Sequence, residues 1–257
     1  QKILQQAMKK EAPFHVYAIS GMGLNEWLFS YLTLDVPLHP IRWIEPLSYQ
    51  ESLESYARRM ATQIQHQENV VLLGVSFGGM VAKTIATFRK IDKIVIVSSI
   101  KSAEEKPLGF ELAALSPIPF YRYTPLAIKK ATIPLWGPLF GLHTQKEQNF
   151  FAEMMNLTSE FYKNWATAQI MHWKDTSPSH HIYHIHGDED KIFPIQHIKR
   201  ARVIRGGDHA MIVKKASQVS ELIHYALYEW QPYYHSTINI SNTTLVSPAS
   251  VSSSLPT

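Results

Sequence analysis

The most constraining feature of this sequence is a continuously apolar run, Val70–Val75, that leads without a break into a Gly-x-Ser-x-Gly motif at residues 74–78. An uninterrupted apolar strand is typical of the middle of a parallel sheet, because both of its faces are covered. Similar runs occupy residues 15–19, 41–44, 94–97, 181–186 and 201–204. Their alternation with helical stretches predicts an α/β fold of about six mostly parallel strands with helices on both faces.

Three of the intervening stretches have apolar residues at the three- and four-residue spacing of an amphipathic helix. They cover residues 52–65, 78–89 and 211–230. We expect the last of them to close the fold, with its apolar stripe facing the sheet.

Residues 101–179 interrupt the alternation, since they contain many prolines and aromatic residues and no clear strand. We expect a helical cap inserted into a core formed by residues 1–100 and 180–235. Most of its aromatic side chains would form the cap's own small core, and a few would line an apolar pocket.

The C-terminal residues 236–257 are rich in Ser and Thr and carry no charge, so we expect a disordered tail there. Asn156, Asn239 and Asn242 begin Asn-x-Ser/Thr patterns. Nothing indicates a secretory context, so we interpret these patterns as chance.

The composition excludes several classes of site and partner. The chain has no cysteine, so it has no disulfide, cysteine-ligated zinc, iron–sulfur cluster or cysteine nucleophile. A net charge of +4 without any long basic run argues against nucleic-acid binding.

No apolar run approaches the ~18 residues that span a bilayer. The first residues lack the apolar core of a signal peptide, and we expect a cytoplasmic protein. The sequence begins at Gln1 and not at Met, which is expected if residues have been removed from its start.

Ser76 lies where a strand passes directly into a helix, which is the setting of a nucleophile elbow. Such a sharp turn strains the backbone of the serine. It needs Gly74 and Gly78 because a Cβ at either position would collide across the turn. The hydroxyl would then lie at a helix N-terminus, whose dipole favours developing negative charge. The alternative is a tight turn whose glycines serve packing only.

A serine nucleophile needs a base, and the base needs a carboxylate to orient it. The run at 181–186 is followed by acidic residues at 188–190, and the run at 201–204 is followed by Asp208 and His209. We expect His209 to take the Ser76 proton and one of the preceding acids to hold its ring. Asp208 is a weaker candidate for that acid, because adjacent residues on an extended segment point apart.

Four segments together resemble the α/β-hydrolase family over roughly residues 14–230: SGMG at 20–23, GVSFGG at 74–79, HGDEDKIFP at 186–194 and GGDHAM at 206–211. The family's acid commonly lies in a G-x-x-D-x-x-x-P pattern, so the resemblance implies Asp190 rather than Asp188. The family's histidine often follows G-G-x, which implies His209. The resemblance also implies an oxyanion hole formed by the backbone N–H groups of Phe77 and Met22.

The sequence departs from the family pattern in three places. Ser20-Gly21 stands where many members have His-Gly, so the resemblance does not say what supports the oxyanion loop. About 13 residues precede the first run, and we expect the family's first two antiparallel strands to be missing. The 19 residues from Asp190 to His209 leave room for about one helical turn before the last strand.

Other binding motifs fit less well. The Gly21-Met22-Gly23 segment fails the dinucleotide fingerprint because Glu26 occupies the third glycine position. The glycines at 74–79 are not a phosphate loop, since no Lys-Ser/Thr follows. His180, His184 and His186 alternate and could share one face of a strand. We expect packing and hydrogen bonding there rather than a metal site, because no matching carboxylate pattern accompanies them.

The sequence therefore predicts a serine hydrolase that cleaves a small-molecule carboxylic ester, with an apolar acyl or aromatic group, through an acyl-enzyme. It predicts no cofactor and no metal, and it does not indicate an oligomeric state. The same three residues could instead serve thioester or carbon–carbon bond hydrolysis. A ligand-binding protein with little turnover is the alternative outside enzymes, and the complete Ser, Asp and His set argues against it.

Overall fold

The computed structural model describes residues 14–110, 135, 137–178 and 181–230. The predicted tail at 236–257, with Asn239 and Asn242, lies outside these residues, and so does His180. No helix in the described ranges is long and apolar enough to cross a membrane.

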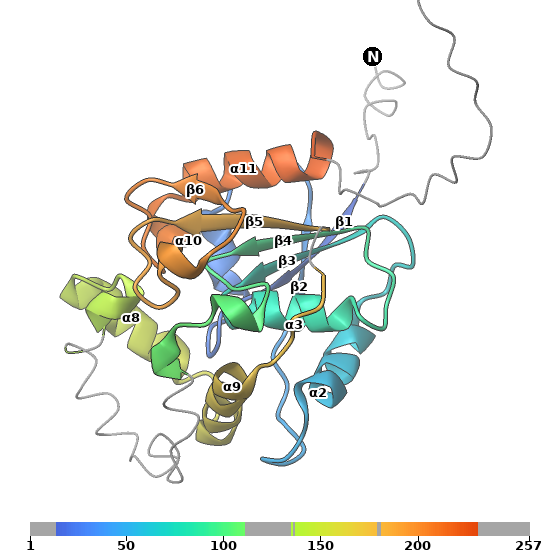
Figure 1. Ribbon diagram of the computed structural model, residues 1–257, viewed down its shortest axis with the longest axis horizontal. Coiled ribbons are helices and arrows are strands. Elements are labelled where there is room, and N and C mark those ends of the chain that lie inside the picture. Colours follow the sequence, from blue (N-terminus) through green and yellow to red (C-terminus); the bar gives the residue numbers. More distant parts are fainter. Residues whose placement is uncertain (1–13, 111–134, 136, 179–180, 231–257) are drawn as a thin grey trace, which may run out of the picture.

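One six-stranded sheet forms the centre of the molecule (Figure 1), with strand order β2-β1-β3-β4-β5-β6 and every neighbouring pair parallel. The strands are β1 (His15–Ile19), β2 (Leu38–Ile41), β3 (Val70–Val75), β4 (Lys93–Val97), β5 (Ile182–Gly187) and β6 (Arg202–Ile204). All residues of β3, β4 and β5 are buried. The predicted parallel α/β architecture is thus confirmed.

Helices cover both faces of this sheet (Figure 1), with α2 and α3 packed on one face and α11 on the other. The α-helices are α2 (Leu53–Met60), α3 (Phe77–Ile85), α8 (Gln145–Met155), α9 (Glu160–His172), α10 (Met211–Lys214) and α11 (Ala216–Tyr228). The 3-10 turns are η1 (Glu26–Tyr31), η2 (Ala61–Gln63), η3 (Ala103–Glu105), η4 (Gly137–Phe140) and η5 (Ile195–His197).

Edge strand β2 was predicted in the wrong place, at residues 41–44 instead of Leu38–Ile41. Pro40 lies inside this strand and pairs with Ala18 of β1. A proline has no N–H to donate, but an edge strand has a neighbour on one side only, so the missing donor can face solvent without loss. Trp43 consequently lies beyond the strand, in the loop that follows it.

The predicted helix boundaries also shift. The first helix passes into the 3-10 turn η2 after Met60, and the second ends at Ile85. The predicted closing helix is broken at Lys215, whose φ of −117° and ψ of 30° are not helical, and this break separates α10 from α11. The apolar stripe correctly predicted which face of this helical segment is buried. The spacing of apolar residues does not show where a helix is broken.

The described part of the predicted insertion, between β4 and β5, is helical. α8 and α9 lie toward the carboxyl ends of the strands, where the arrowheads in Figure 1 point. α8 starts with a capping box, in which the Thr144 side chain accepts from the Glu147 backbone and the Glu147 side chain accepts from the Thr144 backbone. A single 3-10 turn, η5, separates β5 from β6, which fits the short spacing seen in the sequence.

Candidate active site

Ser76 lies between β3 and α3 with φ of 52° and ψ of −121°, a strained conformation for a residue with a side chain. The surrounding backbone holds it there. Ser76 N–H donates to Val97 O at 3.0 Å, and Ser76 O accepts from Gly79 N–H at 2.9 Å and from the Ser99 hydroxyl at 2.6 Å. The fold therefore imposes the sharp turn that the motif predicted.

The flanking glycines are required for space. A Cβ on Gly74 would lie 2.5 Å from Gly78 O, across the turn as predicted. A Cβ on Gly78 would lie 2.3 Å from Ile19 O, so its obstacle is the end of β1 and not the opposite side of the turn. Both close approaches bring the serine elbow against neighbouring backbone, where only glycine fits.

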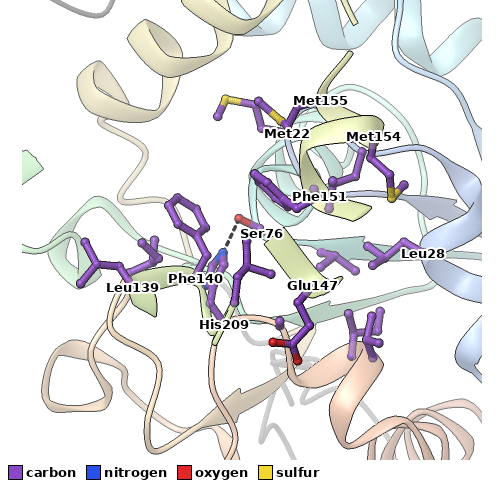
Figure 2. Close-up of a pocket in the computed structure, with 18 of the residues that line it drawn as sticks. Met22, Leu28, Ser76, Leu139, Phe140, Glu147, Phe151, Met154, Met155 and His209 are labelled. Carbon is purple, nitrogen blue, oxygen red and sulfur yellow. Dashed lines mark hydrogen bonds between the residues drawn. The ribbon is translucent and has the colours of Figure 1, made fainter. Parts of the chain in front are cut away.

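Three side chains from different strand ends form a hydrogen-bonded series at the carboxyl edge of the sheet. His209 Nε2 lies 3.0 Å from Ser76 Oγ, and His209 Nδ1 lies 2.8 Å from Asp190 Oδ2. A carboxylate only accepts, so Nδ1 carries the proton and Nε2 is left to accept the serine hydroxyl. Figure 2 shows the bond between His209 and Ser76. The geometry is that of a hydroxyl activated by a base that a carboxylate orients.

Asp190 is buried and held in its charged form. Its Oδ1 accepts the backbone N–H groups of Ile192 and Phe193, both at 2.9 Å. Burial acts to raise the pKa of this carboxyl, but the His209 imidazole, together with His186 and the Phe193 N–H, outweighs burial and lowers the pKa below its usual value. Asp190 is therefore ionised at neutral pH.

The other candidate acids have different partners. Asp188 accepts the Gly206 backbone N–H at 2.7 Å. Asp208 accepts the Ala210 N–H at 2.9 Å and pairs with Lys214 at 2.8 Å. The carboxylate that hydrogen-bonds to the His209 ring is that of Asp190.

A buried chain of polar groups lies behind Asp190, and two of its members are histidines for which we expected packing and hydrogen bonding. Lys101 Nζ lies 3.2 Å from His184 Nδ1, His184 Nε2 lies 3.1 Å from His186 Nδ1, and His186 Nε2 lies 2.8 Å from Phe193 O. The final carbonyl only accepts, so each group donates toward Phe193, beside Asp190. Burial lowers the pKa of His184 and of His186, which keeps both rings neutral. The alternation of histidines in the sequence marked two members of this chain, while Lys101 carried no signal.

Of the two residues whose backbone N–H groups are expected to form the oxyanion hole, Phe77 directly follows the serine and Met22 lines the same cavity. Phe77 is the first residue of α3, so its N–H has no acceptor within the helix. Met22 and Gly21 line the same cavity as Ser76.

The loop that carries Met22 is held by Trp43, which the sequence did not single out. Trp43 Nε1 lies 3.1 Å from both Ser20 Oγ and Gly21 O, and the Ser20 hydroxyl donates to Leu24 O at 2.7 Å. The Trp43 ring stacks on Phe77 with centroids 5.5 Å apart. One indole thus contacts both segments that would supply the oxyanion hole.

A cavity of about 1040 Å³ opens above Ser76. Its wall combines the sheet edge with η4, α8 and α9, and it is mainly apolar (Figure 2). Apolar residues of the wall include Met22, Leu28, Phe140, Phe151, Met155 and Phe193. The rings of Phe140 and Phe193 contact His209 edge-on, with centroids 5.6 and 5.7 Å from it. Of the aromatic residues in the predicted cap, several therefore line the pocket.

Comparisons with known proteins agree with this geometry at the level of the fold. The profile of a family described as "Alpha/beta hydrolase family" matches residues 11–222. A search of the curated proteins found no match. Similar solved structures include a bromoperoxidase from Bacillus anthracis, with 15% identity, a TM-score of 0.60 and coverage of 83% of this chain and 92% of that chain.

Two further solved structures illustrate the range of these neighbours. A thermophilic esterase from Thermogutta terrifontis has 16% identity and a TM-score of 0.57, with 83% of this chain and 89% of that chain covered. A meta-cleavage product hydrolase from Pseudomonas fluorescens has 17% identity and a TM-score of 0.59, with 83% and 90% covered. At these identities the likeness concerns the fold and not the reaction.

Proposed function

The chain belongs to the alpha/beta hydrolase family, and from that premise we propose that it is a serine hydrolase that cleaves small-molecule carboxylic esters through an acyl-enzyme. The supporting observation is the hydrogen-bonded series Ser76, His209 and Asp190 at the floor of an apolar cavity. A protein that only bound a ligand there would not need a base and an oriented carboxylate beside the hydroxyl.

In the acylation step, Ser76 Oγ attacks the ester carbonyl carbon while His209 Nε2 takes the hydroxyl proton. Asp190 holds the ring and stabilises the imidazolium that forms. The backbone N–H groups of Phe77 and Met22 bind the oxyanion of the tetrahedral intermediate. As the carbon–oxygen bond breaks, His209 gives its proton to the leaving alkoxide. Water, deprotonated by the same imidazole, then releases the acid and restores Ser76.

The cavity wall supports a substrate with an apolar acyl chain or an aromatic group. The cavity volume of about 1040 Å³ is at the upper end of the usual range for ligand pockets. The cavity can therefore hold more than a short acyl group. We propose that residues 101–179 act as a cap on a core of residues 1–100 and 180–235, since α8 and η4 contribute part of the wall. Thioester or carbon–carbon bond hydrolysis would use the same three residues, so the substrate panel below includes them.

A fluorophosphonate probe and a substrate panel test the proposal. The probe should lose fluoride and form a covalent bond to Ser76, and Ser76→Ala should abolish labelling. The same variant should lower turnover of p-nitrophenyl esters by ~10⁴-fold or more. Ser30→Ala removes an exposed hydroxyl on η1 and serves as the control. Unchanged ester turnover in folded Ser76→Ala would refute the proposal. Faster turnover of acyl-CoA thioesters or of a carbon–carbon substrate would replace the ester assignment.

A further inference from the structure

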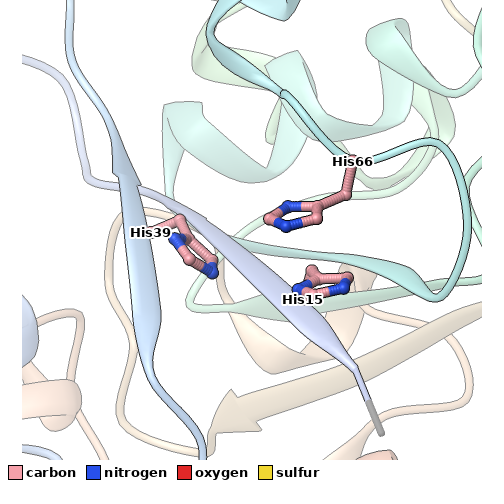
Figure 3. A group of neighbouring side chains, drawn as sticks. All are labelled: His15, His39 and His66. Carbon is pink, nitrogen blue, oxygen red and sulfur yellow. The ribbon is translucent and has the colours of Figure 1, made fainter. Parts of the chain in front are cut away.

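A cluster of three histidine side chains lies at the opposite end of β1 from the serine. It consists of His15, His39 and His66, shown in Figure 3. One ring nitrogen of each histidine lies within 4.8 Å of those of the other two. His15 begins β1, whereas the oxyanion loop follows its last residue, about 13 Å further along at the usual rise per strand residue. The group is therefore separate from the reacting atoms.

The sheet register brings two of these histidines together. Side chains alternate along a strand, so His15 and Tyr17 of β1 lie on one face. His39 of β2 is the parallel partner of Tyr17 and lies on that same face. Their contacts confirm the arrangement, because the His39 ring is 4.9 Å from the Tyr17 ring and 6.1 Å from the His15 ring.

The third histidine comes from the segment between η2 and β3, and its backbone is anchored. Arg89 Nη2 donates to His66 O at 2.8 Å and to Ile64 O at 3.0 Å. The His66 ring stacks on His15 with centroids 3.4 Å apart and planes at 5°, and it lies 5.5 Å from the His39 ring. Three segments that are distant in sequence thus hold three imidazoles in mutual contact.

From this geometry we propose that His15, His39 and His66 form a binding site for a divalent transition-metal ion of the zinc class. Three neutral imidazoles suit Zn²⁺ and its neighbours Co²⁺, Ni²⁺ and Cu²⁺, whereas Mg²⁺ and Ca²⁺ prefer carboxylate and carbonyl oxygens. Three protein ligands leave a fourth tetrahedral position for water. Zinc–nitrogen bonds of 2.0–2.1 Å place donor atoms about 3.3 Å apart. The ring nitrogens lie within 4.8 Å of one another, so binding requires His15 and His66 to rotate out of their stack, and all three side chains are only half-buried.

Tyr17 provides the support that such a site needs. Its hydroxyl lies 2.8 Å from His66 Nδ1, and its oxygen accepts the Gln65 backbone N–H at 2.9 Å. A metal-bound histidine usually hydrogen-bonds through its other ring nitrogen, which fixes the orientation of the ring. The phenol can donate to or accept from Nδ1, so His66 can adopt the tautomer whose Nε2 is free to bind the ion.

The three histidines come from β1, from β2 and from the segment before β3. A bound ion would link edge strand β2 to β1 and to the segment before β3, so it would stabilise this half of the sheet without touching the substrate.

Zinc titration of the full chain, expressed without a histidine tag, tests the site. Calorimetry should show binding of one Zn²⁺ per chain, and Zn²⁺ should raise the melting temperature. Co²⁺ in its place should give the visible d–d absorption of a tetrahedral nitrogen site. His39→Gln and His66→Gln should each weaken binding by at least ~100-fold, and Tyr17→Phe by ~10-fold or more.

His172→Gln, which removes an exposed histidine from α9, is the matched control and should bind zinc as the wild type does. Melting curves in metal-free buffer show whether each variant is folded. His66 is half-buried and lies in a loop, so we expect His66→Gln to fold and to test the site even if His39→Gln unfolds. No binding by the wild type would overturn the proposal. Equal binding by both cluster variants would also overturn it, because the ion would then be held elsewhere, for instance at His209.

Discussion

At the scale of single residues, the candidate site separates groups that react from groups that hold them. Ser76, His209 and Asp190 form one hydrogen-bonded series, and the strained backbone of Ser76 keeps its hydroxyl in line with the ring. The buried polar chain ending at Phe193 O and the two N–H groups on Asp190 Oδ1 fix the carboxylate. The orientation of one imidazole therefore depends on several groups outside the hydrogen-bonded series itself.

Asp190→Asn is expected to lower kcat by ~10⁴-fold with little change in KM, because Asn neither stabilises the imidazolium nor enforces the tautomer with a free Nε2. The measurement is steady-state kinetics on p-nitrophenyl esters. Asp188→Asn is the control, since that exposed carboxylate accepts the Gly206 N–H and leaves the ring alone. A large loss in Asp188→Asn with normal turnover in Asp190→Asn would reverse the assignment of the acid.

The same carboxyl gives the molecule an acid-sensitive contribution to stability. The folded-state pKa of Asp190 is lowered relative to the unfolded value of about 3.9. Its stabilising contribution is thus fully present above that value and is lost as the pH falls through the lower folded pKa. Asp190→Asn does not titrate, so its unfolding free energy should depend less on pH below about 4 than that of the wild type.

Much of the candidate site could be predicted from the sequence, for a chemical reason. A serine hydrolase must have a nucleophile, an acid and a base at strand ends in a fixed chain order, which pointed to Ser76, His209 and an acid before it, and the family resemblance selected Asp190 as that acid. The structure brings the three within hydrogen-bonding distance. Trp43 and Lys101 were not foreseen, because their roles depend on which loops meet in space and no local pattern records this.

At the scale of elements, the buried strands were predicted well and the edge strand β2 poorly. The bounds of β3 match the apolar run because burial on both faces leaves only apolar residues there. β2 contains the polar His39 and Pro40, which an edge position tolerates, so the pattern pointed to residues 41–44. The error concealed two features at once: His39 in the histidine cluster, and Trp43 in a loop where it reaches Gly21.

Trp43→Phe tests whether the loop after β2 positions the oxyanion hole. Phenylalanine retains a ring to stack on Phe77 but loses the indole N–H that reaches Ser20 and Gly21. Loss of a direct oxyanion donor costs about 10²–10³ in kcat. Trp43 acts through the loop, so we expect a smaller fall of about tenfold in kcat with KM unchanged.

Trp27→Phe is the comparison for this variant, because Trp27 is 65% exposed on η1. It should leave kcat and KM as in the wild type. A purely structural role for Trp43 would lower the melting temperature and the amount of active enzyme but leave kcat per labelled active site unchanged, and that result would contradict the prediction.

At the scale of the whole molecule, the strand ends carry the proposed reacting groups, and the segment between β4 and β5 forms much of the cavity wall. The catalytic candidates all follow strand ends, whereas Phe140, Phe151 and Met155 come from η4 and α8. From the sequence we expected a cap with a few pocket-lining aromatic residues, but the shape of the cavity could not be predicted, since an apolar pocket wall and an apolar core have the same composition. Substrate range and reaction chemistry should therefore respond to different substitutions.

The Ala152→Trp substitution tests whether substrate range can be changed without changing the reaction chemistry. Ala152 lines the cavity from α8, so an indole there should occupy space that a long acyl chain would use while leaving Ser76 and His209 in place. We expect the ratio of kcat/KM for long over short p-nitrophenyl esters to fall by at least ~10-fold, because each excluded methylene in an apolar pocket costs about 1–3 kcal/mol. Glu153→Trp adds the same ring at the next position, which is exposed and outside the cavity wall, and it should leave the ratio unchanged.

If both variants lost short and long esters equally, the effect would lie in the stability of α8. If Ala152→Trp changed neither ester, the acyl chain would be bound away from α8, and the cavity would not be the acyl site.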